Sequence, residues 1–289
     1  MHSVRQVGTA LSKIASLAVI LLIVAGMALS TAVLPGTKPV LAAPPVVSIQ
    51  RVSVPNCEAN ASSSASSISA DGRYVAFESY ATNLADGDTN GVSDIFVHDC
   101  QTGETTRVSV DSNSVQGNSD SVYPSISADG RYVAFMSYAS NLVTGDTNGC
   151  FDVFVHDRQT GATTRVSVHS DGTEGDSDSS LPSISADGRY VAFESAATNL
   201  VAGDNNSTWD IFVHDRDTGA TTMVSVDSGG QQSNGESIEC SISADGRYVA
   251  FQSYGTNLVA GDNNSLVDIF VRDRLLGETT RVSVDSSGA

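Results

Sequence analysis

Residues 68–77 read ISADGRYVAF, and this stretch decides the fold because it returns three more times in the chain. The later copies occupy residues 126–135, 184–193 and 242–251, so the period is 58 residues. Two further blocks keep the same period: DIFVHD or a close variant begins at Asp94, Asp152, Asp210 and Asp268, and RVSV or MVSV begins at Arg107, Arg165, Met223 and Arg281. Such repetition is typical of arrays in which each unit buries its faces against its neighbours.

Within one unit the local signals are for β-strands. β-Branched and aromatic residues dominate residues 73–77 and 95–98, and no helical period of apolar positions is present. The Asp71-Gly72 pair predicts a tight hairpin in which both central residues take positive φ. Thr102-Gly103 predicts a second turn. The expected strands are therefore 67–69, 73–79, 94–98 and 105–110, repeated in every unit.

Four antiparallel strands repeated in this way predict an all-β fold, a β-propeller built from four 58-residue blades of four strands each. The expected blades are 55–110, 111–168, 169–226 and 227–284, with a tail at 285–289. A fifth RVSV at residues 51–54 predicts an orphan N-terminal strand within 43–54. The ring either closes with four blades or stays open as part of a longer array. An open edge would permit self-association, because unpaired strand edges template pairing.

The repeat unit resembles the TolB-type, WD40-like β-propeller repeat, with its Ser-x-Asp-Gly-x-x-Ile/Val-Ala-Phe hairpin, a strand ending in Asp, and a Thr-Gly turn. The resemblance covers residues 47–284 and implies a propeller fold. Propellers of this type serve as binding platforms, as periplasmic assembly factors and as gating domains of peptidases. Fold alone does not choose among these roles.

The loop between the second and third strands of each unit departs from that pattern, because it is longer and rich in Asp and Asn. In the first unit, side-chain oxygens of Asp86, Asp88, Asn90 and Asp94 alternate along the loop, with Gly91 at the turn. Calcium prefers six to eight oxygen ligands in a flexible cage. The spacing resembles the calcium loops of integrin-α-like propellers, D-x-D-x-[DN]-G-x-x-D, which implies calcium as a bound cofactor.

The other three units keep three of these four candidate metal ligands. They are Asp146, Asn148 and Asp152 in the second unit, Asp204, Asn206 and Asp210 in the third, and Asp262, Asn264 and Asp268 in the fourth. The first ligand position becomes Thr144, Ala202 or Ala260, so the sequence ranks the first unit as the best site. The alternative is that these Asp and Asn side chains only form turns that cap a long connection.

The N-terminal segment predicts export. Residues 1–13 carry Arg5 and Lys13 and no acid, residues 14–29 are apolar, and Val40-Leu41-Ala42 offers small residues for cleavage, so residues 1–42 read as a signal peptide. An uncleaved membrane anchor is the alternative, since about 20 apolar residues span a bilayer. The expected location is extracellular, at the cell surface or periplasmic, with membrane contact only if the leader is uncleaved.

The charge of the chain excludes one class of partner. The 289 residues include 15 Lys plus Arg against 33 Asp plus Glu, a formal charge of −18. A nucleic-acid partner is excluded because phosphate binding needs a basic face.

The four cysteines stand at different positions of the repeat, so no disulfide recurs in every blade. A Cys57–Cys240 disulfide is one candidate that would link the first and fourth blades and close the ring.

No catalytic residues are predicted. His98, His156 and His214 stand beside Asp99, Asp157 and Asp215, and Arg272 takes the histidine's place in the fourth unit. A catalytic pair does not usually recur blade by blade, so we expect a hydrogen bond between blades, with arginine as the replacement donor. No nucleophile elbow, His-Glu-x-x-His or phosphate-binding glycine loop is present.

The predicted function is therefore that of a secreted, non-enzymatic propeller, stabilised by calcium, that acts as a binding or scaffold module for a protein or polysaccharide ligand on one propeller face. Two alternatives remain at this point. One is the regulatory propeller of an exported hydrolase or peptidase, and the other is a purely structural surface protein without an ion.

Overall fold

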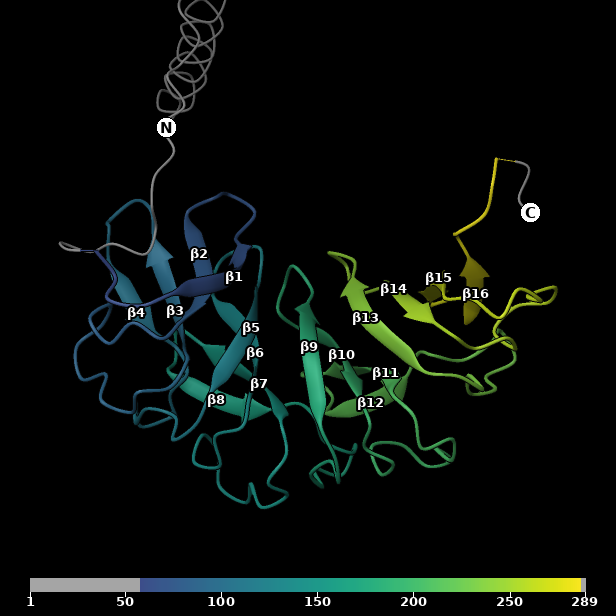
Figure 1. Ribbon diagram of the computed structural model, residues 1–289, viewed down its shortest axis with the longest axis horizontal. Helices are drawn as coiled ribbons and strands as arrows, with labels where there is room; N and C mark the ends of the chain where they lie inside the picture. Colours follow the sequence, from purple (N-terminus) through teal and green to yellow (C-terminus); the bar gives the residue numbers. More distant parts are fainter. Residues whose placement is uncertain (1–57, 287–289) are drawn as a thin grey trace, which may run out of the picture. The chain divides into compact units, whose positions relative to one another are not determined.

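A computed structural model describes residues 58–286. These residues form four antiparallel sheets of four strands, and in each sheet the strands lie side by side in chain order (Figure 1). We call the sheets blades one to four. The predicted all-β propeller architecture is confirmed. The predicted signal peptide, the orphan strand and Cys57 lie outside the described residues, and within those residues no helix is long and apolar enough to cross a membrane.

The strands have nearly the same bounds in every blade. Blade one contains β1 (Ser63–Ile68), β2 (Tyr74–Ser79), β3 (Asp94–Asp99) and β4 (Thr105–Arg107). Blade two contains β5 (Ser121–Ile126), β6 (Tyr132–Ser137), β7 (Asp152–Asp157) and β8 (Ala162–Arg165). Blade three contains β9 (Ser179–Ile184), β10 (Tyr190–Ser195), β11 (Asp210–Asp215) and β12 (Ala220–Met223). Blade four contains β13 (Ser237–Ile242), β14 (Tyr248–Ser253), β15 (Asp268–Asp273) and β16 (Glu278–Arg281).

The fourth strand of each blade is shorter than predicted. After Arg107, the Val108 N–H still donates to the Ile95 carbonyl at 2.8 Å, but the Ile95 N–H donates to the Ser109 hydroxyl instead of to a strand carbonyl. Val110 then pairs with Gln116 in an isolated bridge. A side-chain acceptor and a local bridge thus satisfy groups that a longer strand would have paired.

The hairpin between the first two strands also differs from the prediction. Only Gly72 takes a positive φ, 73°, whereas Asp71 does not. The Asp71 carboxylate accepts hydrogen bonds from the Ser69 hydroxyl at 2.7 Å and from the Arg73 N–H at 3.0 Å. This side chain stabilises a wider turn that needs one left-handed residue, so the predicted pair of positive φ values is wrong.

Each blade packs against the next through two unlike faces. We call the side that contacts the following blade its outgoing face and the side that contacts the preceding blade its incoming face. Between blades one and two, Ile95, Val97 and Val108 of the outgoing face meet Phe135 and Phe154 of the incoming face in one buried cluster. The same positions build the clusters between blades two and three and between blades three and four.

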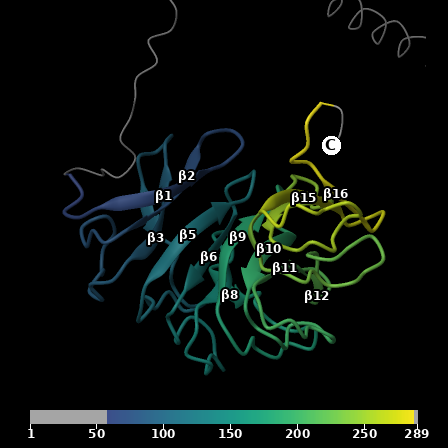
Figure 2. The same cartoon turned by 45° about the vertical axis from the view of Figure 1, so that its right-hand side comes forward.

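The ring is not closed. Strand contacts join blade one to two, two to three and three to four, and no extensive strand packing joins blade one to blade four within residues 58–286. Both views show the blade carrying β1–β4 and the blade carrying β13–β16 at the two ends of the row (Figures 1 and 2). The outgoing face of blade four is therefore uncovered, which corrects the expectation that both faces of every sheet are buried.

Candidate functional site

The predicted ligand loops lie at one edge of each sheet, where the third strand begins and the fourth strand ends. In blade one, Asp94 is the first residue of β3 and Arg107 is the last residue of β4. The Nη1 atom of Arg107 lies 3.4 Å from Asp88 Oδ1 and 3.7 Å from Asp94 Oδ2. The two carboxylates are 2% and 0% exposed. The structure thus brings Asp88 and Asp94 together around a guanidinium group.

The hydrogen bonds of Asp94 anchor this arrangement. The Ser109 hydroxyl donates to Asp94 Oδ1 at 2.5 Å, and Asn90 Nδ2 donates to Asp94 Oδ2 at 3.0 Å. Burial raises the pKa of Asp88 and that of Asp94, because a carboxylate away from water is costly to ionise. The positive charge of Arg107 opposes both shifts.

Two of the four predicted ligands of blade one offer no oxygen atom to this centre. Asn90 turns its nitrogen toward Asp94, while its oxygen accepts a hydrogen bond from the Val92 N–H at 3.2 Å. Asp86 lies exposed in the loop. The repeat position that supplies Arg107 was visible in the sequence at the start of RVSV, but its distance along the chain concealed its contact with the loop.

Blade two adds a third carboxylate to the same arrangement. Oxygens of Asp146, Asp152 and Glu174 lie within 4.8 Å of one another. Arg165 Nη1 is 3.5, 3.1 and 2.9 Å from these three carboxylates in the same order. Burial and then the neighbouring charge of Asp152 raise the pKa of Asp146 to about 6. One positive charge therefore faces three acids, and within residues 58–286 this is the one grouping of three acidic, histidine or cysteine side chains close enough to share a metal ion.

Glu174 was missed by the sequence reasoning. It stands in the connection after the fourth strand, at the repeat position that Gln116 and Gln232 occupy in blades one and three. Its carboxylate reaches back to the loop, where the Thr147 N–H donates to Oε2 at 3.0 Å. The signal that could have revealed it is the replacement of an amide by an acid at a fixed position of the repeat. The grouping of carboxylates is thus tightest in unit two, although the sequence ranked unit one first.

Blade three has no arginine at its site, because Met223 occupies that repeat position. The amide of Gln232 takes its place, and Nε2 donates to Asp204 Oδ1 at 2.7 Å and to Asp210 Oδ2 at 2.8 Å. Burial raises the pKa of both carboxylic acids. Asn206 Nδ2 donates to the Ser233 carbonyl at 3.0 Å, as Asn90 Nδ2 in blade one donates to the Gly117 carbonyl at 3.0 Å.

Blade four repeats the arrangement of blade one. Arg281 Nη1 lies 3.5 Å from Asp262 Oδ1 and 3.4 Å from Asp268 Oδ2. Hydrogen bonding by the Ser283 hydroxyl lowers the pKa of Asp268, whose counterparts in the other blades are shifted upward. Asn264 Nδ2 faces Asp268 Oδ2 at 3.4 Å, as Asn148 Nδ2 faces Asp152 Oδ2 at 3.0 Å in blade two.

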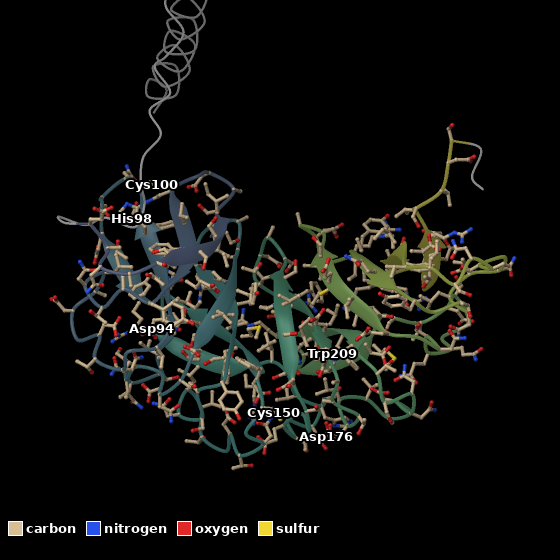
Figure 3. All side chains as sticks on the ribbon, in the orientation of Figure 1. Asp94, His98, Cys100, Cys150, Asp176 and Trp209 are labelled. Atoms are coloured by element: carbon tan, nitrogen blue, oxygen red, sulfur yellow. The ribbon has the colours of Figure 1, made fainter. Side chains whose placement is uncertain are left out.

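The predicted hydrogen bond from histidine to a neighbouring blade is wrong, because the histidine bonds a threonine of its own blade and the threonine makes the contact between blades. His156 Nδ1 lies 2.9 Å from Thr163 Oγ1, and this hydroxyl donates to the Val110 carbonyl of the preceding blade at 2.5 Å. In blade four Arg272 donates to Thr279 Oγ1 at 3.0 Å, so arginine does replace histidine as donor. Figure 3 shows Asp94 and His98, both of β3, at separate places along the blade.

These histidines predict acid sensitivity. Burial lowers the pKa of His156 and that of His214 to about 4, whereas an unfolded histidine titrates near 6.5. Between these values the unfolded state binds more protons, so stability is present above pH 6.5 and is lost as the pH falls toward 4. We expect a loss of about 2 kcal/mol per histidine between pH 7 and pH 5.

Urea denaturation of the wild type and of the His156→Gln, His214→Gln double variant at both pH values measures this loss. The raised pKa of Asp146 acts in the opposite direction, since its penalty is relieved when it is protonated, and the double variant retains that effect. An equal fall of stability in the two proteins would show that the histidines do not cause it.

The three described cysteines, Cys100, Cys150 and Cys240, are free thiols. Burial raises the pKa of Cys150, so this thiol is not activated toward the thiolate. The proposed partner of Cys240, Cys57, lies outside the described residues. Cys100 and Cys150, both labelled in Figure 3, lie on different blades, since Cys100 follows β3 and Cys150 precedes β7.

Comparisons with solved structures find similar chains at low sequence identity. No family model and no curated protein sequence matches the chain. TolB from Acinetobacter baumannii is similar at 18% identity and a TM-score of 0.46, over 77% of this chain and 43% of that chain. A putative TolB from Agrobacterium tumefaciens is similar at 19% identity and a TM-score of 0.47, over 74% and 62%. A puromycin-hydrolyzing peptidase from Mycobacterium tuberculosis is similar at 12% identity and a TM-score of 0.46, over 76% and 28%.

The chain thus spans less than two thirds of the length of each of these structures. The similar structures include TolB proteins, the type that the repeat unit resembles. The architecture itself is established by the four repeated sheets: this chain is an all-β protein of propeller blades with an unclosed ring.

Proposed function

We propose that this chain is an exported, non-enzymatic binding or scaffold module whose blades are stabilised by calcium at the loop edge. The cluster of Asp146, Asp152 and Glu174 supports the calcium site, because three carboxylates converge on a single guanidinium and keep a net negative charge in a half-buried place. Carboxylate oxygens are the ligands that calcium prefers. The apolar N-terminal leader supports export.

The repeated polar networks support a non-enzymatic role. The histidines are engaged with threonines, and the aspartates beside them accept hydrogen bonds from the hairpin arginines, as Asp157 does from Arg131 at 2.9 and 2.7 Å. The histidine contact recurs in blades one to three, and the arginine–aspartate contact recurs in all four blades. Side chains that make the same contact in successive blades are more consistent with holding the repeat together than with catalysis.

Calcium and Arg165 compete for the same carboxylates in this proposal. The Nη2 atom of Arg165 also donates to the Gly145 carbonyl at 3.1 Å, so this hydrogen bond helps to hold the guanidinium beside the three carboxylates. Calcium binding requires the guanidinium to withdraw. Replacement of Arg165 by methionine, the residue at the same repeat position in blade three, removes the competitor and leaves the three acids in place.

Melting temperatures in excess chelator and in millimolar calcium test this site. At a calcium concentration 100 times Kd we expect a stabilisation of about 2.7 kcal/mol, a rise of about 5–10 °C for a domain of this size. Glu174→Gln should reduce the rise, and Arg165→Met should enlarge it. Glu104→Gln, which removes one exposed acid elsewhere, is the control and should behave as the wild type. If calcium shifts none of these proteins, or shifts all four equally, the site does not bind it.

A further inference from the structure

The outgoing face of blade four is an uncovered copy of a surface that is buried three times elsewhere in the molecule. At the isoleucine position of the third strand, exposure is 0% for Ile95, Val153 and Ile211 but 36% for Ile269. At the first valine after the fourth strand, it is 1% for Val108, 1% for Val166 and 3% for Val224 but 48% for Val282. The side chains are of the same kind, so only the missing neighbour differs.

A tyrosine on this face also lacks half of its usual surroundings. The ring of Tyr74 lies between two guanidinium groups, with Arg73 of its own blade at 4.7 Å and Arg158 of the next blade at 4.4 Å. Tyr132 and Tyr190 are enclosed in the same way, by Arg216 and Arg274 of the following blades. Within residues 58–286, Tyr248 of blade four meets only Arg247, at 4.8 Å, and it is 40% exposed.

A chain of backbone hydrogen bonds between blades stops at the same place. The Ala70 N–H donates to the Ala128 carbonyl at 3.0 Å, the Ala128 N–H donates to Ala186, and the Ala186 N–H donates to Ala244. The Ala244 N–H, the next donor in this series, has no backbone acceptor among residues 58–286. Apolar, cationic and hydrogen-bonding features of the internal interfaces are therefore all present on blade four without a counterpart.

We propose that the outgoing face of blade four docks a further blade of this repeat type as its partner. The partner is defined by what covers the equivalent face of blade one. It presents an incoming face of phenylalanine, valine and leucine, as Phe135 and Leu142 do. It carries a glycine that fits under the tyrosine ring, as Gly130 does, and an arginine that stacks on that ring, as Arg158 does. This deepens the scaffold role proposed above by naming the class of partner, and it does not depend on calcium.

Blade one of a second copy does not meet this description. Cys100 stands at the repeat position where blades two to four carry Arg158, Arg216 and Arg274. On the incoming face of blade one, Ile68 is 61% exposed, but the phenylalanines that a docking face presents are already buried, with Phe77 at 3% and Phe96 at 0% exposure. Blade one of a second copy would therefore offer no stacking arginine and no exposed phenylalanine, so it does not supply the partner blade.

Grafting a blade onto the full chain tests the proposal directly. A copy of residues 111–168 is placed after Val284 in place of the last five residues, which keeps the 58-residue phase. In excess chelator, the melting temperature should rise by about 5 °C or more, because each docked repeat adds an interface. Binding of a hydrophobic dye to the chain should fall at the same time, since Ile269 and Val282 become covered.

Two variants of the graft separate docking from mere attachment. Gly130→Ala within the grafted copy leaves its apolar face intact but places a Cβ against the Tyr248 ring, and Ile269→Asp in the host alters the docking face itself. Each should remove most of the gain, while Ile269→Asp in the ungrafted chain should leave the melting temperature nearly unchanged. Sedimentation of the ungrafted chain should show a monomer. The proposal is overturned if the graft gives no gain, if both variants keep it, or if the ungrafted chain dimerises at micromolar concentration.

Discussion

Replacing Asp94 with alanine is expected to destabilise the protein by about 3–5 kcal/mol, because it leaves a buried guanidinium without one of its two carboxylates. Asp94 is fully buried, and Arg107 approaches it at 3.7 Å. The hydroxyl of Ser109 and the amide of Asn90 also lose their acceptor, which adds the cost of unsatisfied polar groups. Urea denaturation in excess chelator measures the effect without any contribution from a bound ion.

Asp86→Ala is the matched control for that change. Both aspartates are candidate ligands of the same loop, but Asp86 is exposed, so its removal in chelator should change stability by less than about 0.5 kcal/mol. Equal losses in the two variants would contradict a stabilising contact between Arg107 and Asp94. A loss for Asp86→Ala that appears only when calcium is added would instead identify Asp86 as a calcium ligand.

Gly130→Ala is expected to destabilise the protein by about 2–5 kcal/mol, because the substitution strains the backbone and forces two blades apart. Gly130 has a φ of +73°, and a Cβ at this position would stand 2.1 Å from Cδ2 of the Tyr74 ring. The left-handed conformation costs an alanine about 1–2 kcal/mol. Displacing the ring in a packed interface costs about 1–3 kcal/mol more.

The equivalent substitution in blade one isolates the second contribution. Gly72 also has a φ of +73°, but its nearest neighbour for a Cβ is Ile68 Cδ1 at 4.0 Å. Gly72→Ala should therefore cost only the backbone strain, and Gly188→Ala, with the same 2.1 Å approach to Tyr132, should match Gly130→Ala. Chemical denaturation of the three variants measures the difference. If Gly72→Ala is as damaging as Gly130→Ala, the contact between blades is not what makes this glycine necessary.

Several features of the fold were predictable because they depend on local sequence. The period, the number of blades and the second and third strands follow from the alternation of apolar residues and from the glycine turns. The position of the hairpin was predicted correctly but its backbone conformation was not, since the Asp71 carboxylate stabilises a turn with one left-handed residue. Strand ends were less predictable, because the Ser109 hydroxyl replaces a backbone acceptor after Arg107.

The candidate site was predictable only in part. Asp88 and Asp94 were found because they stand a few residues apart in one loop. Arg107 comes from the following strand, and Glu174 of blade two comes from the connection beyond it, so no spacing within the loop could reveal either. Comparison of the four units would nevertheless have drawn attention to both residues. Arginine recurs at the position of Arg107 in three units, and Glu174 replaces a glutamine that units one and three carry.

The amino-acid sequence by itself determined that this protein contains four alike, acidic, four-stranded blades. Strands and turns form through interactions between residues close in the sequence, so a repeated sequence gives repeated strands and turns. Only the tertiary structure decided which charges meet and which face stays open. Arg107 lies beside the loop carboxylates because folding brings the end of one strand to the start of another. Ile269 and Val282 are exposed although their counterparts are buried, because burial depends on the neighbour that a residue receives and not on the residue itself.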